Sequence, residues 1–240
     1  MRIQSTKSYG YDSIKMLIYG SPAIGKTSLA GTTGEPTCVI SAEAGLLSLS
    51  GHDIDFIDMG HDDDGLMLPP SKRFDRLKDA FKYLMTEEAQ KKYKWVFLDS
   101  LTEMGQLLHE KLLAKYPDRK DALILWGEMN TEMRSMIKAF RDIRGYNVVF
   151  TALAQPEKDE NGRRSQGVML QGKISDQLPA YFDEVFYYTM IDDEVKGQTR
   201  VLFTDSTDKF VAKDRSGKLD PIEKPDLKNI AEKIRKAQKQ

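Results

Sequence analysis

Short apolar runs along the 240-residue chain alternate with longer segments in which apolar positions recur every three or four residues. The apolar runs predict buried strands at about 14–19, 37–42, 95–98 and 147–153. Helical spacing predicts helices at about 71–89, 101–115 and 121–143. Strands that alternate with helices favour an α/β fold, with a mostly parallel, twisted sheet flanked by helices.

The pattern changes after Gln155. Residues 156–173 are polar and rich in glycine, which predicts a mobile loop. Two further strands, at about 183–191 and 199–205, predict an antiparallel hairpin added to the edge of the sheet. The segment 225–240 predicts a basic amphipathic helix or a frayed tail.

The most specific motif is an eight-residue run that fits the phosphate-binding pattern G-x-x-x-x-G-K-[ST]. It follows the first apolar run and precedes Ser28-Leu29-Ala30, which predicts the start of a helix. Backbone N–H groups in such a strand–loop–helix context form a nest for the β-phosphate of a nucleotide. We expect Lys26 to reach the β- and γ-phosphates and the Thr27 hydroxyl to hold Mg²⁺. The predicted phosphate-binding residues are Gly20, Ser21, Pro22, Ala23, Ile24, Gly25, Lys26, Thr27 and Ser28.

Composition argues against a membrane-spanning protein, a disulfide-stabilised protein and a protein of strongly basic or acidic character. Hydrophobic residues make up 40% of the chain, charged residues make up 30%, and the net charge is −1, so no global field draws the protein to nucleic acid or membrane. The single cysteine, Cys38, excludes a disulfide within the chain and favours a reducing compartment. No apolar run reaches membrane-spanning length, and we expect a cytoplasmic protein. Without a repeat or a linker, we expect one domain over 1–240, with its core at about 14–216.

Phosphoryl transfer also needs a metal ligand and an oriented nucleophile. Asp99 ends the third apolar run, where its carboxylate is expected to support Mg²⁺ through water; a plain helix cap is the alternative. Ser100 follows it, in the position where many ATPases carry a water-activating glutamate. Glu43, just past the second strand, is therefore the candidate base, unless it is a solvated loop residue. The Gln155 amide is expected to sense the γ-phosphate and to signal to the loop that follows.

Basic residues after the last predicted strand are candidates for contacts between subunits. Lys213 and Arg215 are expected to reach the nucleotide of a neighbouring copy as finger residues, and Lys209 lies nearby. A solvated basic loop is the alternative. The finger interpretation implies a homo-oligomer.

Acidic residues gather between Gly51 and Gly65, where six aspartates occur together with His52 and His61. Their spacing matches no standard pattern of metal ligands. A solvated loop is therefore the expectation for this stretch.

The ordered set of motifs resembles the RecA-like recombinase core. The phosphate loop, the Ile40-Ser41-Ala42-Glu43-Ala44 run, the Leu98-Asp99-Ser100 strand end and the strand ending in Gln155 occur in that family's order. The resemblance implies that Glu43 activates water and that Gln155 couples the nucleotide state to a DNA-binding loop. The chain departs from the recombinases at Ala154-Gln155, where they usually have Asn-Gln.

The chain resembles more closely the RecA-like members of the Sak single-strand annealing proteins of phages. The similarity lies in Ala42-Glu43-Ala44-Gly45-Leu46 and Val211-Ala212-Lys213-Asp214-Arg215, and it covers most of residues 14–216. It implies ATP- and Mg²⁺-dependent binding and annealing of single-stranded DNA during recombination, with a single-strand-binding protein as a further possible partner.

The residues themselves give a weaker signal for DNA than for nucleotide. The candidate DNA contacts are Arg163, Arg164 and Lys173. Their segment, 156–173, contains four basic and three acidic residues, and it has no aromatic residue for base stacking. The basic segment 224–240 is a second candidate for phosphate contacts. Two alternatives stay open: a P-loop small-molecule kinase, with 163–164 as a thin lid, and a nucleotide-gated binding module with little turnover.

Overall fold

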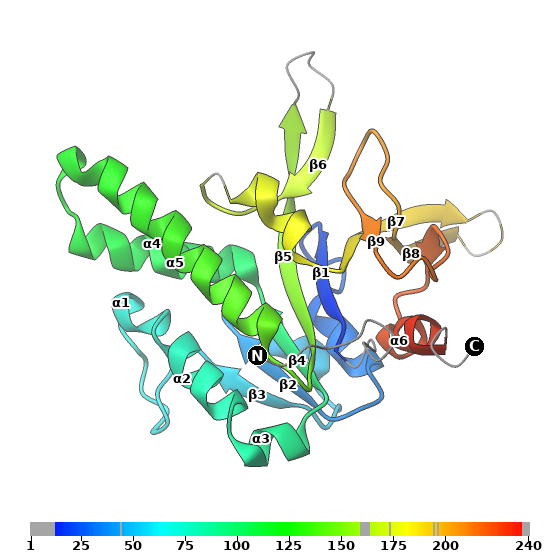
Figure 1. Ribbon diagram of the computed structural model, residues 1–240, viewed down its shortest axis with the longest axis horizontal. Helices are drawn as coiled ribbons and strands as arrows, with labels where there is room; N and C mark the ends of the chain where they lie inside the picture. Colours follow the sequence, from blue (N-terminus) through cyan, green and yellow to red (C-terminus); the bar gives the residue numbers. More distant parts are fainter. Residues whose placement is uncertain are drawn as a thin grey trace, which may run out of the picture.

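A sheet with a parallel centre organises the chain (Figure 1). The computed structural model describes residues 13–43, 45–158, 164–172, 174–193, 195 and 197–236. The strand order is β10-β8-β7-β1-β5-β4-β2-β3, and β6 and β9 pair with β5 and β7. The strands are β1 (Lys15–Gly20), β2 (Thr37–Ser41), β3 (Asp55–Asp58), β4 (Trp95–Asp99), β5 (Asn147–Lys158), β6 (Arg164–Val168), β7 (Glu184–Asp193), β8 (Gly197–Phe203), β9 (Lys213–Asp214) and β10 (Ile222–Glu223).

The parallel centre confirms the four strands predicted from apolar runs. In register, Gly20 of β1 lies beside Leu153 of β5 and Tyr188 of β7, and Ser41 of β2 lies beside Asp99 of β4. All these strands therefore end at one edge of the sheet, which we call the carboxyl edge. The β7–β8 pair is the predicted antiparallel hairpin, because β7 runs parallel to β1 and antiparallel to β8.

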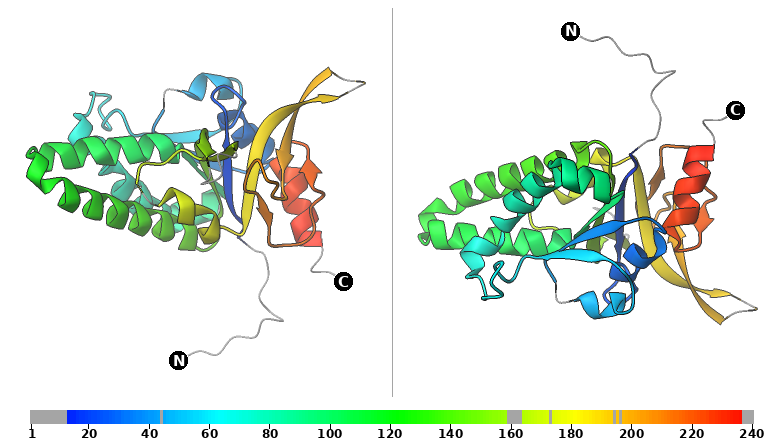
Figure 2. Two further views of the ribbon diagram at one scale, coloured as in Figure 1. Left: turned by 90° about the horizontal axis from the view of Figure 1, so that it is seen from above. Right: turned by 90° about the horizontal axis from the view of Figure 1, so that it is seen from below.

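Helices cover both faces of the sheet. The α-helices are α1 (Pro70–Arg73), α2 (Arg76–Leu84), α3 (Glu87–Lys92), α4 (Leu101–Lys115), α5 (Ala122–Asp142) and α6 (Leu227–Lys236). The 3₁₀ helices are η2 (Thr27–Thr32), η3 (Gly45–Leu49), η4 (Arg119–Asp121) and η5 (Ser175–Tyr181). Figure 2 shows the long α4–α5 pair on one side of β1 and α6 on the other. None of the helices in the described ranges has the length and apolar character needed to cross a bilayer.

The alternation of side chains along β1 explains the two layers. Leu17 and Tyr19 pack into the core beneath α2, α4 and α5. Met16 and Ile18 face the opposite way and pack with apolar residues of η2 and α6. Strands buried on both faces read as continuous apolar runs, which is why their positions were predictable.

The predicted helix at 71–89 is wrong as a single element, because three short helices occupy its place. Thr86 is extended, and its hydroxyl accepts a hydrogen bond from the Ala89 amide (3.3 Å). This cap starts α3 afresh and separates it from α2. β3 was not predicted from the sequence, because this edge strand is only partly covered and carries aspartate at both ends.

The predicted mobile loop at 156–173 is wrong at 156–158 and 164–168, which form strands, while 159–163 and 173 lie outside the described residues. β5 continues to Lys158, and β6 returns antiparallel beside it, so that Gln155 pairs with Gly167 and Lys158 with Arg164. This β5–β6 hairpin extends past the main sheet (Figure 1). Its residues are only partly buried, so no apolar alternation announces it in the sequence.

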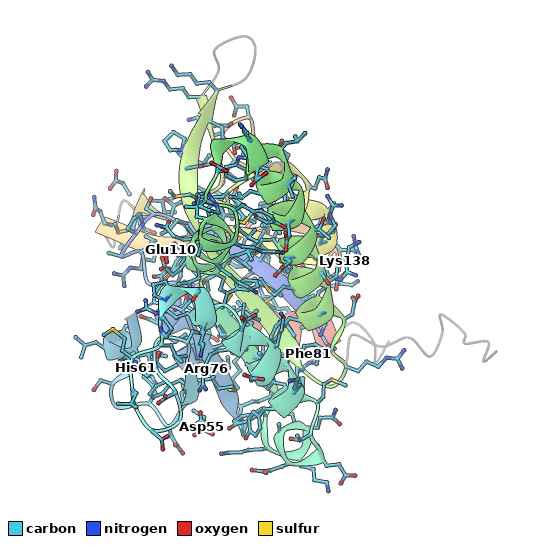
Figure 3. The ribbon with its side chains drawn as sticks, turned by 90° about the vertical axis from the view of Figure 1, so that its left-hand side faces the viewer. Asp55, His61, Arg76, Phe81, Glu110 and Lys138 are labelled. Atoms are coloured by element: carbon cyan, nitrogen blue, oxygen red, sulfur yellow. The ribbon has the colours of Figure 1, made fainter. Side chains whose placement is uncertain are left out.

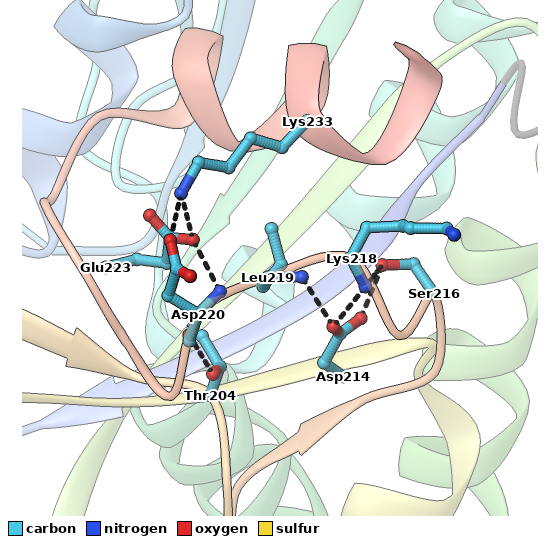
Figure 4. Close-up of polar contacts among 8 residues, drawn as sticks. All are labelled: Thr204, Asp214, Ser216, Lys218, Leu219, Asp220, Glu223 and Lys233. Atoms are coloured by element: carbon cyan, nitrogen blue, oxygen red, sulfur yellow. Dashed lines mark hydrogen bonds and ion pairs between the residues drawn. The ribbon is translucent and has the colours of Figure 1, made fainter. Parts of the chain in front are cut away.

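The C-terminal helix was predicted as basic and amphipathic, and α6 confirms this. Leu227, Ile230, Ala231 and Ile234 are buried in the core that η2 shares. Lys233 on its polar side binds Asp220 and Glu223 at 2.6 and 2.7 Å (Figure 4). Part of the basic charge of this segment is therefore neutralised within the chain.

Candidate functional site

The phosphate loop joins β1 to η2 at the carboxyl edge. It departs from ordinary backbone at two places, Ala23 with φ 60° and Gly25 with φ 106°. A side chain is excluded at Gly20, since a Cβ there would lie 2.2 Å from the carbonyl oxygen of Tyr188. Ser21, Pro22 and Ala23 are exposed, whereas Ile24 is buried and anchors the loop in the core. The loop is thus fixed at its base and open to a ligand at its tip.

The helix predicted to start behind the loop is present and short. η2 is a six-residue 3₁₀ helix, because glycine and threonine residues at 31–34 are poor helix formers. Ser28 lies exposed in its first turn. Anion binding therefore depends on the loop amides and on Lys26 more than on a long helix dipole.

Lys26 is buried beneath the loop, and its ammonium donates to the carbonyl oxygens of Gly20 (3.1 Å) and Ser21 (2.9 Å). Burial lowers the pKa of Lys26, and the negative charges of Glu43 and Asp99 oppose that shift. The lysine thus lies between the loop and two carboxylates that come from other strands. An anionic phosphate in the loop would offer it a stronger partner than neutral carbonyls.

Asp99 is buried at the end of β4 and accepts two hydroxyl hydrogen bonds. One comes from Thr27 Oγ1 to Asp99 Oδ2 (2.7 Å), and the other comes from Thr151 Oγ1 on β5. The direct contact between Thr27 and Asp99 brings together the two residues predicted to serve Mg²⁺. Hydroxyl and carboxylate oxygens are the hard ligands that Mg²⁺ prefers, so this donor set fits the ion.

Glu43 lies half-buried just past β2, beside the end of β4. Its carboxylate Oε1 accepts a hydrogen bond from Ser100 Oγ, and its backbone oxygen accepts one from Ser41 Oγ (2.6 Å). The Ala42 amide donates to the Asp99 carbonyl (2.8 Å), which ties the two strand ends together. Glu43 is therefore a held side chain and not a free loop glutamate.

Glu103 adds a further carboxyl group in the first turn of α4. Burial raises its pKa, and the charge of Glu43 adds to the effect. No sequence pattern indicated a role for Ser100, Thr151 or Glu103. The hydroxyl residues that end β4 and line β5 were a usable signal, but their partners are more than fifty residues away in the chain.

Gln155 lies on β5 two residues beyond the position of Gly20. Its Nε2 donates to the Val168 carbonyl of β6 (3.4 Å). The amide thus joins the carboxyl edge to the β5–β6 hairpin. Its proposed contact with a γ-phosphate stays a prediction.

Lys213 and Arg215 lie at the other end of the sheet. Asp214 pairs with Glu184, which is level with Met16 at the start of β1. Lys213 donates to the Pro179 carbonyl (2.8 Å), and Arg215 forms an ion pair with Asp183 (2.8 Å). Figure 4 shows the next turn, closed on Asp214 by the amides of Lys218 and Leu219. These two basic side chains do not approach the phosphate loop of their own chain, and a role in a neighbouring subunit stays a prediction.

The remaining candidates are the predicted DNA contacts and the acidic segment between Gly51 and Gly65. Arg164 is exposed at the start of β6, while Arg163 and Lys173 lie outside the described residues. In the acidic segment, Asp58 pairs with His61 (2.7 Å) and Asp63 with Arg76 (2.9 Å), on the side of the molecule seen in Figure 3. Among the described residues, no group of three or more His, Cys, Asp or Glu side chains forms a metal site.

Comparisons with known proteins identify a family for this chain. The comparison with curated proteins found no match. A solved structure of an ATPase from the type III secretion system of pathogenic bacteria aligns with a TM-score of 0.49 at 14% identity, over 73% of this chain and 51% of that chain. This chain therefore spans about half the length of that ATPase. A family model described as an AAA domain, AAA_24, matches residues 12–216. The chain belongs to this AAA_24 family, and it is a P-loop NTPase domain.

Proposed function

We propose that the protein hydrolyses ATP with Mg²⁺ and uses the cycle to bind and anneal single-stranded DNA. The observation that carries the proposal is the contact of Thr27 with Asp99 beside Lys26 and Glu43. A phosphate loop, a metal-supporting carboxylate and a candidate base meet there at one edge of the sheet. These are the parts that phosphoryl transfer to water requires.

Each residue of the site has a distinct task in this proposal. The loop amides and Lys26 hold the β- and γ-phosphates and offset their charge. Glu43 accepts a proton from the attacking water, and Ser100 positions the Glu43 carboxylate through its hydroxyl. Thr27 and Asp99 would hold Mg²⁺, which supplies charge neutralisation on the phosphates when bound.

The DNA part of the proposal rests on the β5–β6 hairpin. Thr151, which binds Asp99, and Lys158, which pairs with Arg164, belong to one continuous strand. The strand therefore runs from the nucleotide site to Lys158, which lies opposite the basic residue Arg164. Two basic residues side by side suit the phosphate backbone of a nucleic acid, which contributes most of sequence-independent affinity.

Assembly of several copies is also part of the proposal. Lys213 and Arg215 lie far from their own phosphate loop, so they would act only on a nucleotide bound to a neighbouring copy. Hydrolysis by isolated chains is then expected to be slow. A single-strand-binding protein is proposed as a further partner.

Phosphate release from ATP, measured with and without single-stranded oligonucleotide, tests the proposal. Wild-type protein should release phosphate, and DNA should stimulate the rate. Glu43→Gln should lower kcat by about 100-fold, since loss of a general base costs at least this much. Arg164→Ala should weaken DNA stimulation, whereas Arg144→Ala, an exposed arginine at the opposite edge, should not.

Three results would contradict the proposal in different ways. Phosphate found on a nucleoside or nucleotide acceptor would indicate a kinase. Unchanged hydrolysis in Glu43→Gln would indicate a binding module in which Glu43 has no catalytic role. Failure of wild-type protein to bind single-stranded oligonucleotide at low salt would remove the DNA part and leave the ATPase.

A further inference from the structure

The β7–β8 hairpin lies against the outer flank of the phosphate loop. A Cβ placed on Gly25 would be 3.4 Å from the Tyr188 hydroxyl oxygen and 3.9 Å from Arg200 Nη1. Gly25 directly precedes Lys26, so these two side chains approach the loop at its phosphate-binding end. Neither residue was singled out in the sequence, because only the register of the hairpin brings them to the loop.

Arg200 is free to take a ligand. It is exposed on β8, and its guanidinium makes no hydrogen bond or ion pair with any described residue. Leu202, two residues further on, packs in the same core as Ile24 of the loop and Tyr188. Because side chains alternate along a strand, Arg200 lies on that same face, beside the loop. Tyr188 is almost fully buried and forms the wall between the arginine and β1.

The order of the strands sets the direction in which a triphosphate would lie. Asp99, which ends β4, and Glu43, which lies just past β2, would serve the γ end. β7 and β8 lie on the other side of β1 in the sequence β8-β7-β1-β5-β4-β2. A nucleotide held by the loop with its γ-phosphate toward Glu43 must therefore extend its α-phosphate and nucleoside toward the hairpin.

We propose that Arg200 binds the α-phosphate of the nucleotide held in its own chain's loop. The inference rests on the proposed nucleotide binding, and it names a second cation for the same polyanion. The planar guanidinium suits two phosphate oxygens at once, which a lysine at this position would not match. Arg200 would thus hold ATP and ADP equally, and it would not distinguish them.

Isothermal titration calorimetry in Mg²⁺ tests the assignment with ATP, ADP and inorganic tripolyphosphate as ligands. Arg200→Ala should weaken all three by about 10-fold, the effect of one lost charge-assisted contact. Arg200→Lys should recover part of the loss. Arg144→Ala removes an exposed arginine at the other edge of the sheet and should leave all three affinities unchanged. Equal melting temperatures of the variants show that the fold is retained.

Other patterns would overturn the assignment. A loss confined to ATP would place Arg200 at the γ-phosphate. A loss for ATP and ADP with unchanged tripolyphosphate binding would place it at the nucleoside. Wild-type affinities in Arg200→Ala would remove the inference and leave the proposed function intact. Failure of the wild-type protein to bind Mg-ATP would instead refute the proposed function, and the inference with it.

Discussion

Thr151→Val removes one hydroxyl donor from the buried Asp99 carboxylate and keeps the shape of the side chain. Both residues are almost completely buried, at 0% and 2% exposure, so water cannot replace the lost donor. Thr27 remains as the other donor, at 2.7 Å. The variant therefore measures how much of the stability of the fold depends on this carboxylate.

The expected cost follows from the charge of the acceptor. A hydrogen bond to a charged group contributes about 1.5–3 kcal/mol, and a buried acceptor left without its donor loses all of it. For a chain of this size, we expect a loss of about 2 kcal/mol and a fall in Tm of about 4–8 °C. The affinity for Mg-ATP should also fall, because Asp99 is less firmly held against Thr27.

Unfolding in guanidinium chloride and differential scanning calorimetry measure the change. Thr131→Val is the matched control, since its hydroxyl donates to the Gly127 carbonyl (2.8 Å) on the exposed side of α5. That control should change the free energy of unfolding by less than about 0.5 kcal/mol. Equal stabilities of the two variants would refute the reasoning that the Asp99 cluster is a major polar support of the core.

Three further predictions concern the loop, a buried acid and the candidate base. Gly20→Ala should separate β1 from β7 and lower the Tm, because its Cβ would lie 2.2 Å from the Tyr188 carbonyl oxygen. In the control Gly127→Ala, in α5, the added Cβ has no neighbour within 4 Å, so a thermal melt should show an unchanged or higher Tm. Burial, together with the charge of Asp214, raises the pKa of Glu184 from 4.5 to about 8. The folded state therefore binds the proton of the Glu184 carboxyl group more tightly than the unfolded state does. The free energy of unfolding should fall as pH rises from about 5 to 8. Glu184→Gln should flatten that dependence in urea titrations at several pH values, and a slope identical to wild type would count against it. Ser100→Ala should lower kcat by about 10-fold with ATP affinity within twofold in steady-state kinetics, since Ser100 holds Glu43 and also caps α4 through the Glu103 amide. An unchanged kcat would exclude the positioning role.

The sequence was sufficient for those parts of the site that depend on local spacing. The phosphate loop, Asp99 and Glu43 were predictable because each follows an apolar run that is buried on both faces, and parallel strands end at one edge. The contact of Thr27 with Asp99 confirms that these residues meet.

The parts that the sequence did not reveal depend on register and on exposed strands. Arg200 reaches the loop only because β8 pairs with β7 in one particular alignment, with Arg200 opposite Met190. Ser100 holds a residue 57 positions away. β3 and the β5–β6 hairpin carry polar residues along partly exposed backbone, so no apolar run marks them. Sequence patterns report burial, and these segments have little of it.

β5 has a mechanical consequence because it is one uninterrupted strand. Its twelve residues span about 40 Å. The first half is buried inside the sheet, and the second half extends beyond it. It contains no glycine, and Pro156 stiffens the projecting half. The strand therefore has no flexible hinge residue, and a small tilt at Thr151 produces a larger displacement at Lys158. A pair of spin labels, one at Lys158 and one in α4, would measure that tilt as a change in distance when nucleotide is added.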